Sequence, residues 1–522
     1  MHIRQVEGIG DRLEEDIRNI LNRAGIYFRI FSRAKTPFSI AQKLEKPGYG
    51  FGEHDKKMQD LIGLRVVVYY QDDMDIVRTI LEKTFRQVGE WSKTDNTEEE
   101  FKASKLNGVF WVPEEYQRVY NGDITANGCG KMADFTLKAL GEIRKLGATH
   151  IWYTGIIEHA TETDYRRFNI RPDHPAIVKG KAGSPYAIKD YYDVDPDLAT
   201  DVPERMKEFE NLVHRTHRSG LKVIIDFVPN HVARQYHSDA QPDGTTELGA
   251  NDDPNYAFSP YNNFYYIPQS ELRAQFDMKE GAAEPYHEYP AKATGNNRFD
   301  ATPNINDWYE TIKLNYGVDY LNGGTCHFSP TPDTWIKMLD ILLFWASKGI
   351  DGFRCDMAEM VPVEFWEWAI PQVKEAHPEI LFIAEVYNPN EYRNYLFRGK
   401  FDYLYDKVGL YDTLRNVACG YESAVSITHC WQSLNGIEKQ MLNFLENHDE
   451  QRIASDFFAG DPRKGIPALI VSACMNTNPM MIYFGQEFGE LGMDSEGFSG
   501  RDGRTTIFDY WSVDTIRRWR NG

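Results

Sequence analysis

The stretch GFRCDMAEM (352–360) decides the fold, because it places an arginine and then acids at the end of a short apolar run. Three further segments have a similar design: VIIDFVPNH (223–231), FIAEVYN (382–388) and NFLENHDEQR (443–452). Short apolar runs bounded by polar residues are typical of strands buried in a parallel sheet. Helical patterns separate these runs, so the sequence predicts alternating strands and helices joined by right-handed crossovers.

Three acids in these segments, Asp356, Glu385 and Asp449, are candidate catalytic residues. In a closed parallel barrel the functional groups lie at the carboxyl ends of the strands, where these acids are expected. A nucleophilic acid and a proton donor ~5–5.5 Å apart are the equipment of a retaining glycosidase. Arg354 is expected to point to the same side as Asp356 and to keep it ionised. The apolar run before Glu385 is expected to favour its protonated form.

A single acid after a strand is more often a helix cap or an ion-pair partner than a catalytic group. Four such segments in one order are much harder to obtain by chance. His448 directly precedes Asp449, so an imidazole and a carboxylate are available there to bind hydroxyl groups.

Composition and net charge exclude several classes of function. The chain has 522 residues, of which 42% are hydrophobic, and a formal net charge of −20. A large core is therefore feasible, and the negative charge argues against nucleic acid as a partner. The six cysteines lack the spacing of a zinc site and are expected to be reduced. No apolar run reaches the roughly 18 residues of a membrane span, and no signal peptide is evident, so we expect a cytoplasmic protein of unknown oligomeric state.

The character of the sequence changes near residues 105–125. We expect a small α+β segment over 1–105, a junction over 106–125 and the barrel over 126–522, with an inserted subdomain at about 232–331, where no periodicity is clear. The expected barrel strands are 149–153, 222–227, 352–356, 381–386, 402–405, 441–445 and 480–484. The expected helices are 132–146, 206–216, 335–347 and 363–375.

Residues from about 120 to 522 resemble the alpha-amylase family of glycoside hydrolases. DFVPNH, GFRCDMAE, AEVYN and FLENHD match the four signature regions of that family in order. The resemblance implies a (β/α)₈ barrel of the TIM type with a small domain inserted after the third strand. It also implies a retaining hydrolase or transglycosylase that acts on α-1,4-glucans such as starch, glycogen or maltooligosaccharides.

The same resemblance assigns roles to single residues. Asp356 would be the nucleophile, Glu385 the general acid/base and Asp449 the third acid that stabilises the distorted sugar. The positions that match substrate-binding residues of the family are Arg354, His231, His448, Tyr186 and Asp226. Asn230 matches a position that often ligates calcium, and the resemblance implies no other cofactor for this part of the chain. A plain loop amide at Asn230 and ordinary packing of Tyr186 remain open.

Two features depart from the family pattern. GVFWV (108–112) is the best candidate for the first barrel strand, since no typical copy precedes the helix at 132–146. Little chain remains between 484 and Gly522 for the last helix. We therefore expect a barrel that is incomplete at its first strand and last helix.

Residues from about 1 to 118 resemble the start of the RelA/SpoT-type alarmone synthetase domain, through SRAKTPFSIAQKLEK (32–46) and DLIGLRVVVYYQDD (60–73). That family transfers pyrophosphate from ATP to a guanine nucleotide. The resemblance implies that Arg33 and Lys35 meet ATP phosphates and that Asp60 binds magnesium, whereas a solvated charged face is the alternative. The EIQIRT-like segment of the family is absent, so we expect a truncated, non-functional domain.

Two such fragments in one chain suggest a spliced reading frame. The rival functions are therefore a pyrophosphoryl transferase remnant and a non-catalytic glucan-binding protein.

Overall fold

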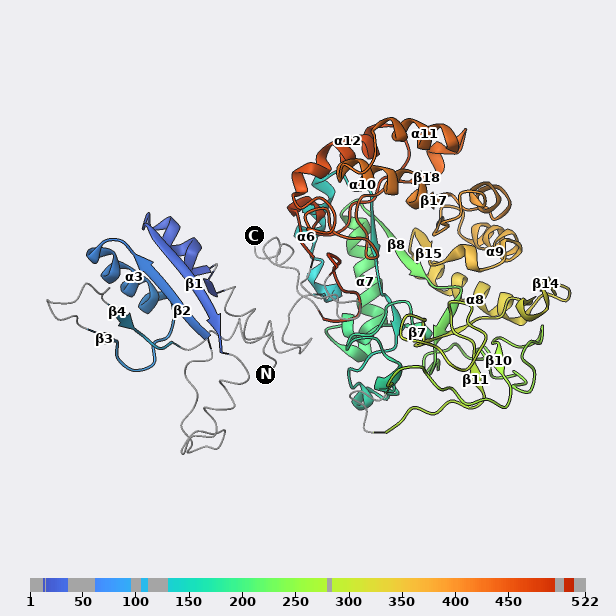
Figure 1. Ribbon diagram of the computed structural model, residues 1–522. Helices are drawn as coiled ribbons and strands as arrows, with labels where there is room; N and C mark the ends of the chain where they lie inside the picture. The colour runs from blue at the N-terminus through green and yellow to red at the C-terminus, as the bar shows by residue number, and fades with distance from the viewer. Residues whose placement is uncertain are drawn as a thin grey trace. The chain divides into compact units, whose positions relative to one another are not determined.

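The computed structural model describes residues 13–14, 16–35, 62–94, 105–110, 130–278, 284–492 and 502–510. The chain divides into two compact units, Met1–Cys129 and Gly130–Gly522 (Figure 1). All four signature segments belong to the second unit.

A six-stranded parallel sheet forms the centre of the second unit, with strand order β18-β17-β16-β15-β8-β5 (Figure 1). The strands are β5 (His150–Tyr153), β8 (Lys222–Phe227), β15 (Gly352–Cys355), β16 (Leu381–Ala384), β17 (Tyr403–Tyr405) and β18 (Met441–Leu442). Every pairing between neighbours is parallel. This is the strand–helix alternation of a (β/α)₈ barrel, and it confirms the predicted fold class.

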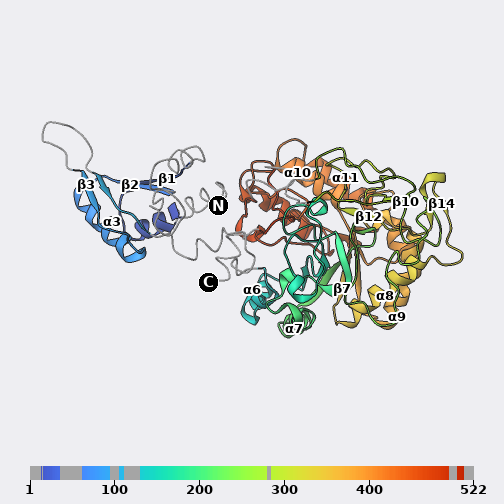
Figure 2. The same ribbon diagram turned by 90° about the horizontal axis from the view of Figure 1, so that it is seen from below.

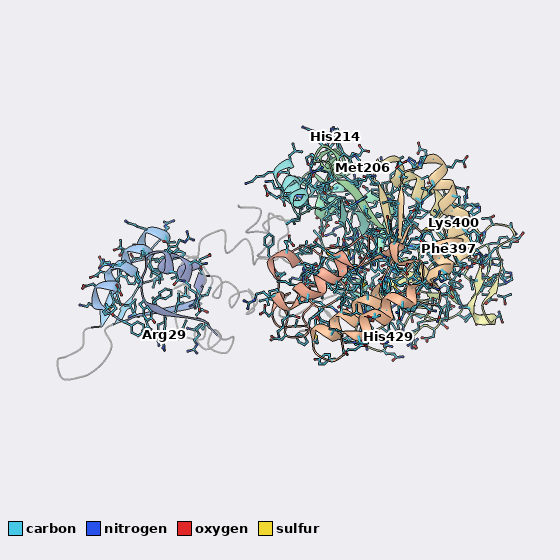
Figure 3. The ribbon with its side chains drawn as sticks, turned by 90° about the horizontal axis from the view of Figure 1, so that it is seen from above. Arg29, Met206, His214, Phe397, Lys400 and His429 are labelled. Atoms are coloured by element: carbon cyan, nitrogen blue, oxygen red, sulfur yellow. The ribbon has the colours of Figure 1, made fainter. Side chains whose placement is uncertain are left out.

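Seven α-helices of the described residues accompany the sheet. They are α6 (Leu137–Lys145), α7 (Arg205–Arg218), α8 (Asp333–Ser347), α9 (Val363–Ala376), α10 (Asp412–Ala418), α11 (Val425–Leu434) and α12 (Ile466–Cys474). In α7, Phe209, Leu212 and Thr216 recur at helical spacing and are buried, while His214 is exposed on the outer side (Figure 3). None of the described helices combines the length and apolar character needed to cross a membrane.

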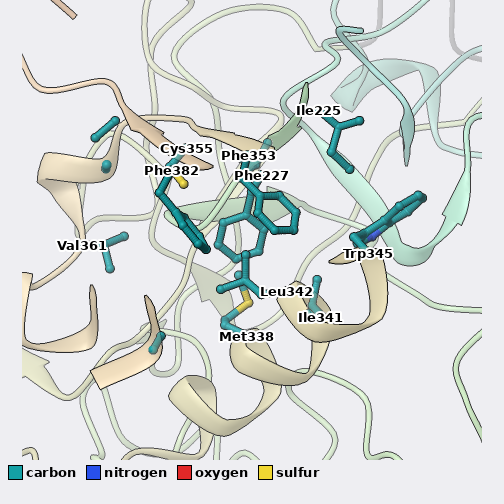
Figure 4. Packing of buried hydrophobic residues seen from close by; sticks show 14 of the residues in the cluster. Ile225, Phe227, Met338, Ile341, Leu342, Trp345, Phe353, Cys355, Val361 and Phe382 are labelled. Carbon is teal, nitrogen blue, oxygen red and sulfur yellow. The ribbon is translucent and has the colours of Figure 1, made fainter. Parts of the chain in front are cut away.

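Aromatic side chains fill the space between the sheet and α8 (Figure 4). Phe227 of β8 and Phe353 of β15 are fully buried, with ring centroids 6.0 Å apart. Trp345 of α8 is also fully buried, and its indole nitrogen donates to the backbone oxygen of Tyr191 at 2.7 Å. Each such side chain contributes roughly 1.5–3 kcal/mol through burial. This packing fixes the strands whose carboxyl ends bear the candidate acids.

Two predicted barrel strands are not observed as such. In GVFWV, Val109 pairs with Val88 through its backbone oxygen, and Phe110 packs edge-on against Phe85, so this stretch joins the first unit up to residue 110. There Phe110 packs against the aromatic rings of Phe85 and Trp91. The predicted strand 480–484 is reduced to one parallel bridge between Asn443 and Met480.

The region between β8 and α8 contains short antiparallel pairs that do not belong to the parallel sheet. Its short antiparallel pairs are β9 (His231–Ala233) with β12 (Thr311–Lys313), β10 (Tyr266–Ile267) with β11 (Ala291–Lys292), and β13 (Val318–Asp319) with β14 (Thr325–Cys326). Figure 2 shows β10, β12 and β14 grouped on one side of this unit. A further antiparallel pair, β6 (Ile157–His159) with β7 (Ile188–Val194), lies between β5 and α7 in the chain.

The described part of the first unit contains two antiparallel pairs, a helical stretch over residues 16–23 and one further helix. The pairs are β1 (Phe28–Ala34) with β2 (Ile62–Val68), and β3 (Ser92–Thr94) with β4 (Lys105–Asn107). Helix α3 (Gln71–Thr84) follows β2 and contributes Val77 to a small core with Ile30 of β1. Burial alternates along β2, so one face of the β1–β2 pair packs inward, and Arg29 lies on the exposed face (Figure 3).

Candidate active site

The parallel register brings the candidate residues to neighbouring strand ends. Arg354 of β15 lies opposite Asp226 of β8, and Asp356 follows β15 directly. The backbone nitrogen of Asp356 donates to Phe227 at 2.9 Å, and that of Glu385 donates to Cys355 at 3.1 Å. These bonds continue the sheet ladder and fix both acids at the carboxyl edge.

Arg354 joins three of the acids. Its Nη1 contacts Asp356 Oδ1 at 2.9 Å and Asp226 Oδ1 at 3.4 Å, and its Nη2 lies 2.9 Å from Glu385 Oε2. Its Nε donates to the Tyr405 hydroxyl at 3.1 Å. Only 1% of Arg354 is exposed, and a planar guanidinium is the group that can serve several acids at once in a buried site. We call Arg354, Asp226, Asp356 and Glu385 the Arg354 cluster.

The electrostatics of Asp356 differ from the expectation. Burial raises the pKa of Asp356 to about 8, although Arg354 opposes the rise, while Glu385 and Asp226 add to it. Burial likewise raises the pKa of Asp226 against the same guanidinium. The single guanidinium of Arg354 therefore does not offset the cost of burying Asp356 and Asp226. The sequence showed the arginine next to Asp356 but not the other two acids that share it.

Glu385 is surrounded by polar donors rather than by the apolar groups that its sequence neighbours suggested. Its Oε2 accepts from the backbone nitrogen of Met357 at 2.8 Å, and its Oε1 accepts from the Tyr387 hydroxyl. Met357 has φ 42° and ψ 42°, in the left-handed region that side chains rarely adopt. This strained turn directs the amide of Met357 to the acid, as is common at functional sites.

Asp449, His448 and Tyr186 form a second part of the site. The His448 Nε2 lies 3.0 Å from Asp449 Oδ2 and 2.8 Å from the Tyr186 hydroxyl, and the two rings stack with centroids 5.2 Å apart. Although loss of solvent works the other way, His448 lowers the pKa of Asp449 to about 2. The Asp449 side chain is 42% exposed, so an ionised acid borders the buried cluster.

Tyr186 connects these two parts. Arg354 lies over its ring at 5.4 Å from the centroid, and 8% of Tyr186 is exposed. His448 occupies one face of the ring, so Tyr186 has a packing role here whether or not it also contacts a sugar. The structure therefore gathers Asp226, Arg354, Asp356, Glu385, Tyr186, His448 and Asp449.

Three side chains at the site were missed in the sequence. The Trp152 indole of β5 donates to Asp226 Oδ2 at 2.8 Å, Tyr405 of β17 accepts from Arg354, and Tyr387 donates to Glu385. Trp152 and Tyr405 lie in predicted strands, but only the strand order places them next to the acids. Tyr387 stands two residues after Glu385 in FIAEVYN, which was the available signal.

His231 lies beside Asn230, at the edge of the inserted region. Burial lowers the pKa of His231 to about 3, and Lys313 acts in the same direction, so the ring is neutral. It hydrogen-bonds to the backbone of Tyr186 and packs on Trp308 with centroids 5.2 Å apart. None of its described contacts is with the Arg354 cluster.

Asn230 does not fit the calcium ion that the resemblance implies. Its side-chain oxygen accepts from the amino group of Lys313, so that oxygen already faces a nitrogen donor. Burial lowers the pKa of Lys313 to about 7.

Another group of acids lies on β6, β7 and a neighbouring loop. Oxygens of Glu158, Asp190, Asp193 and Asp239 lie within 4.8 Å of one another. Arg205 contacts Asp193 and Asp239, and Lys189 lies near Glu158, so the charge of this group is partly balanced by the protein itself. Burial raises the pKa of Glu158 to about 9.

The nucleotide-binding positions of the first unit are only partly described. Arg33 is exposed on β1, opposite Gly63 of β2, and Lys35 follows that strand. Asp60, the predicted magnesium ligand, lies outside the described residues. Residues 32–109 match the family model of a region found in RelA/SpoT proteins.

Residues 116–519 match the family model of the alpha-amylase catalytic domain. Alpha-amylase 3 of Dictyoglomus thermophilum is 25% identical over 355 residues, covering 65% of this chain and 61% of that protein. An alpha-1,4-glucan:maltose-1-phosphate maltosyltransferase of Cereibacter sphaeroides is 25% identical over 287 residues, covering 52% of this chain and 36% of that protein. The cyclomaltodextrinase of Geobacillus thermopakistaniensis is 23% identical over 320 residues, covering 60% and 46%.

Among solved structures, the cyclic alpha-maltosyl-(1→6)-maltose hydrolase of Arthrobacter globiformis has a TM-score of 0.48 and 19% identity, covering 77% of this chain and 74% of that one. This chain thus spans less than two thirds of the curated relatives named above. The catalytic-domain match nevertheless extends over most of its own length, and the chain belongs to the alpha-amylase family.

Proposed function

We propose that this chain is a retaining glycoside hydrolase or transglycosylase acting on α-1,4-glucans such as starch, glycogen or maltooligosaccharides. The observation that carries the proposal is the guanidinium of Arg354, which contacts both Asp356 and Glu385. Two acids that share one guanidinium lie close together, as the acid pair of a glycosidase does. The names of the relatives support an α-glucan as the substrate class.

In the proposed reaction, Asp356 attacks the anomeric carbon while Glu385 gives a proton to the leaving oxygen. The glycosidic bond breaks as an ester bond to Asp356 forms, and water or a sugar hydroxyl, deprotonated by Glu385, then displaces the ester. Burial raises the pKa of Asp356 to about 8, so the ionised form that attacks becomes more populated as pH rises toward that value, and Arg354 favours it. Asp449 and His448 are placed to accept and donate hydrogen bonds with sugar hydroxyls.

The test is incubation with a panel of α-glucans, followed by product analysis and by NMR of the anomer released first. We expect the α-anomer from the wild type and no turnover by Asp356→Asn. Asp164→Asn is the matched control, because Asp164 is exposed and bonds only locally to Arg166. Wild-type turnover by folded Asp356→Asn would refute the assignment, and glucan binding without turnover by the wild type would favour the non-catalytic rival.

The roles of the two acids can be separated chemically. Glu385→Ala should cleave aryl maltosides with good leaving groups slowly, and azide should raise that rate by displacing the ester on Asp356. Asp356→Ala has no ester to displace with retention, so azide should give no product of retained configuration. The opposite pattern would exchange the two roles.

A further inference from the structure

Lys313 lies where the inserted region meets the barrel. It is the last residue of β12, opposite His231 of β9 in the antiparallel pair, and 2% of it is exposed. Its Nζ donates to the Asn230 side-chain oxygen and to the backbone oxygen of Met360 at 3.1 Å. Asn230 follows β8 and Met360 follows β15, so one amino group connects β12 to segments after two barrel strands.

The orientation of Asn230 is fixed by a second partner. Its Nδ2 donates to the backbone oxygen of Gly295 at 2.9 Å, which leaves Oδ1 as the atom that faces Lys313. The close approach of Gly295 supports this contact, because a Cβ at Gly295 would meet Thr311 Oγ1 at 2.6 Å. An amide oxygen and a backbone oxygen thus converge on one point, and such oxygens are what calcium accepts in proteins.

At that point the structure places the Lys313 Nζ atom where a metal ion would lie. Calcium is bound by about six to eight oxygens in proteins. Here the Asn230 side-chain oxygen and the Met360 backbone oxygen instead accept hydrogen bonds from the N–H groups of Lys313. Within the described ranges, no carboxylate forms an ion pair with Lys313, so the site also lacks the negative charge that attracts a divalent ion. The amino group of Lys313 occupies the space between these two oxygens that an ion would need.

We infer that Lys313 replaces a calcium ion at Asn230, and that it fastens the inserted region to the barrel without a metal. This inference is independent of the proposed function, since it concerns how two parts of the second unit are held together. Its consequence is a barrel whose stability at this junction does not respond to chelators.

The experiment compares the Tm of the full chain in excess EDTA and in excess calcium chloride, and the rate at which a protease cuts within residues 232–331. We expect the same wild-type Tm in both. Lys313→Met keeps the length of the side chain but loses its donors, so its Tm should fall by a few degrees in both conditions, with faster cleavage. Lys145→Met, at a side chain that is 72% exposed, is the matched control and should behave as the wild type.

A wild-type Tm that rises with calcium, with the rise lost in Asn230→Ala, would overturn the inference. A Lys313→Met variant with the Tm and cleavage rate of the wild type would also overturn it. A calcium-dependent rise that Asn230→Ala retains belongs to another site, and the loss in Lys313→Met then supports the inference. If Lys313→Met does not fold, Lys313→Gln, which keeps a shorter neutral donor, takes its place.

Discussion

Arg354→Lys is the sharpest perturbation of the site, because it keeps the positive charge and removes the planar fork. The guanidinium makes four contacts, with Asp356, Glu385, Asp226 and Tyr405. Three nitrogens of the guanidinium divide these partners among them, and we expect a single ammonium to retain about two of the contacts. Each lost contact to a charged partner costs ~1.5–3 kcal/mol, so two cost about 3–6 kcal/mol.

If this loss is felt in the transition state, kcat falls by about 10²–10⁴-fold. The assay is kcat and KM for a maltooligosaccharide over a range of pH, with Tm measured on the same samples. Arg398→Lys is the matched control, since Arg398 is 44% exposed and pairs with Glu364 and Glu367. A folded Arg354→Lys enzyme with kcat within about tenfold of the wild type and an unchanged pH profile would refute the reasoning.

Three further outcomes are expected. Tyr387→Phe removes a hydrogen-bond donor from Glu385, so kcat/KM should fall by about tenfold, and an unchanged kcat/KM would show that this contact is not functional. Burial raises the pKa of Glu158 to about 9, so between the ordinary value of ~4.3 and about 9 the folded chain keeps a proton that the unfolded chain has released, and the free energy of unfolding falls as pH rises. Glu158→Gln should flatten that fall and raise Tm at alkaline pH, whereas an unaltered slope in Tm against pH would contradict the assignment. Incubation with ATP and GTP should yield no pyrophosphorylated guanine nucleotide by chromatography, because the sequence lacks the second acidic segment of an alarmone synthetase; a product would revive that rival.

The strands at the centre of the barrel could be predicted because their apolar runs indicate buried strands directly. In VIIDF and GFRC nearly every side chain is buried, so local pattern and final environment agree. GVFWV has the same apolar character, but its backbone pairs within the first unit. The apolar pattern alone does not indicate which segment a strand pairs with.

The acids could be located for a similar reason, while their environment could not. Each follows a predicted strand, yet the polar donors around Glu385 come from Met357 and Tyr387, and the pKa of Asp356 depends on acids far away in sequence. Lys313 shows most clearly which contacts the sequence alone does not predict. In the sequence it is one polar residue in a short strand, and only the fold brings it to Asn230.

The hydrogen bond between Tyr186 and His448 spans 262 positions of the chain, and one between Thr161 and Tyr510 spans 349. During synthesis, Arg354 and the acids Asp226, Asp356 and Glu385 are made before His448 and Tyr510. A nascent chain can therefore bring Asp356 to Arg354 early, whereas the contacts made by His448 and Tyr510 form only after much more of the chain has been synthesised. Such long-range contacts predict slow folding and make chaperone access during that interval important for the yield of folded protein.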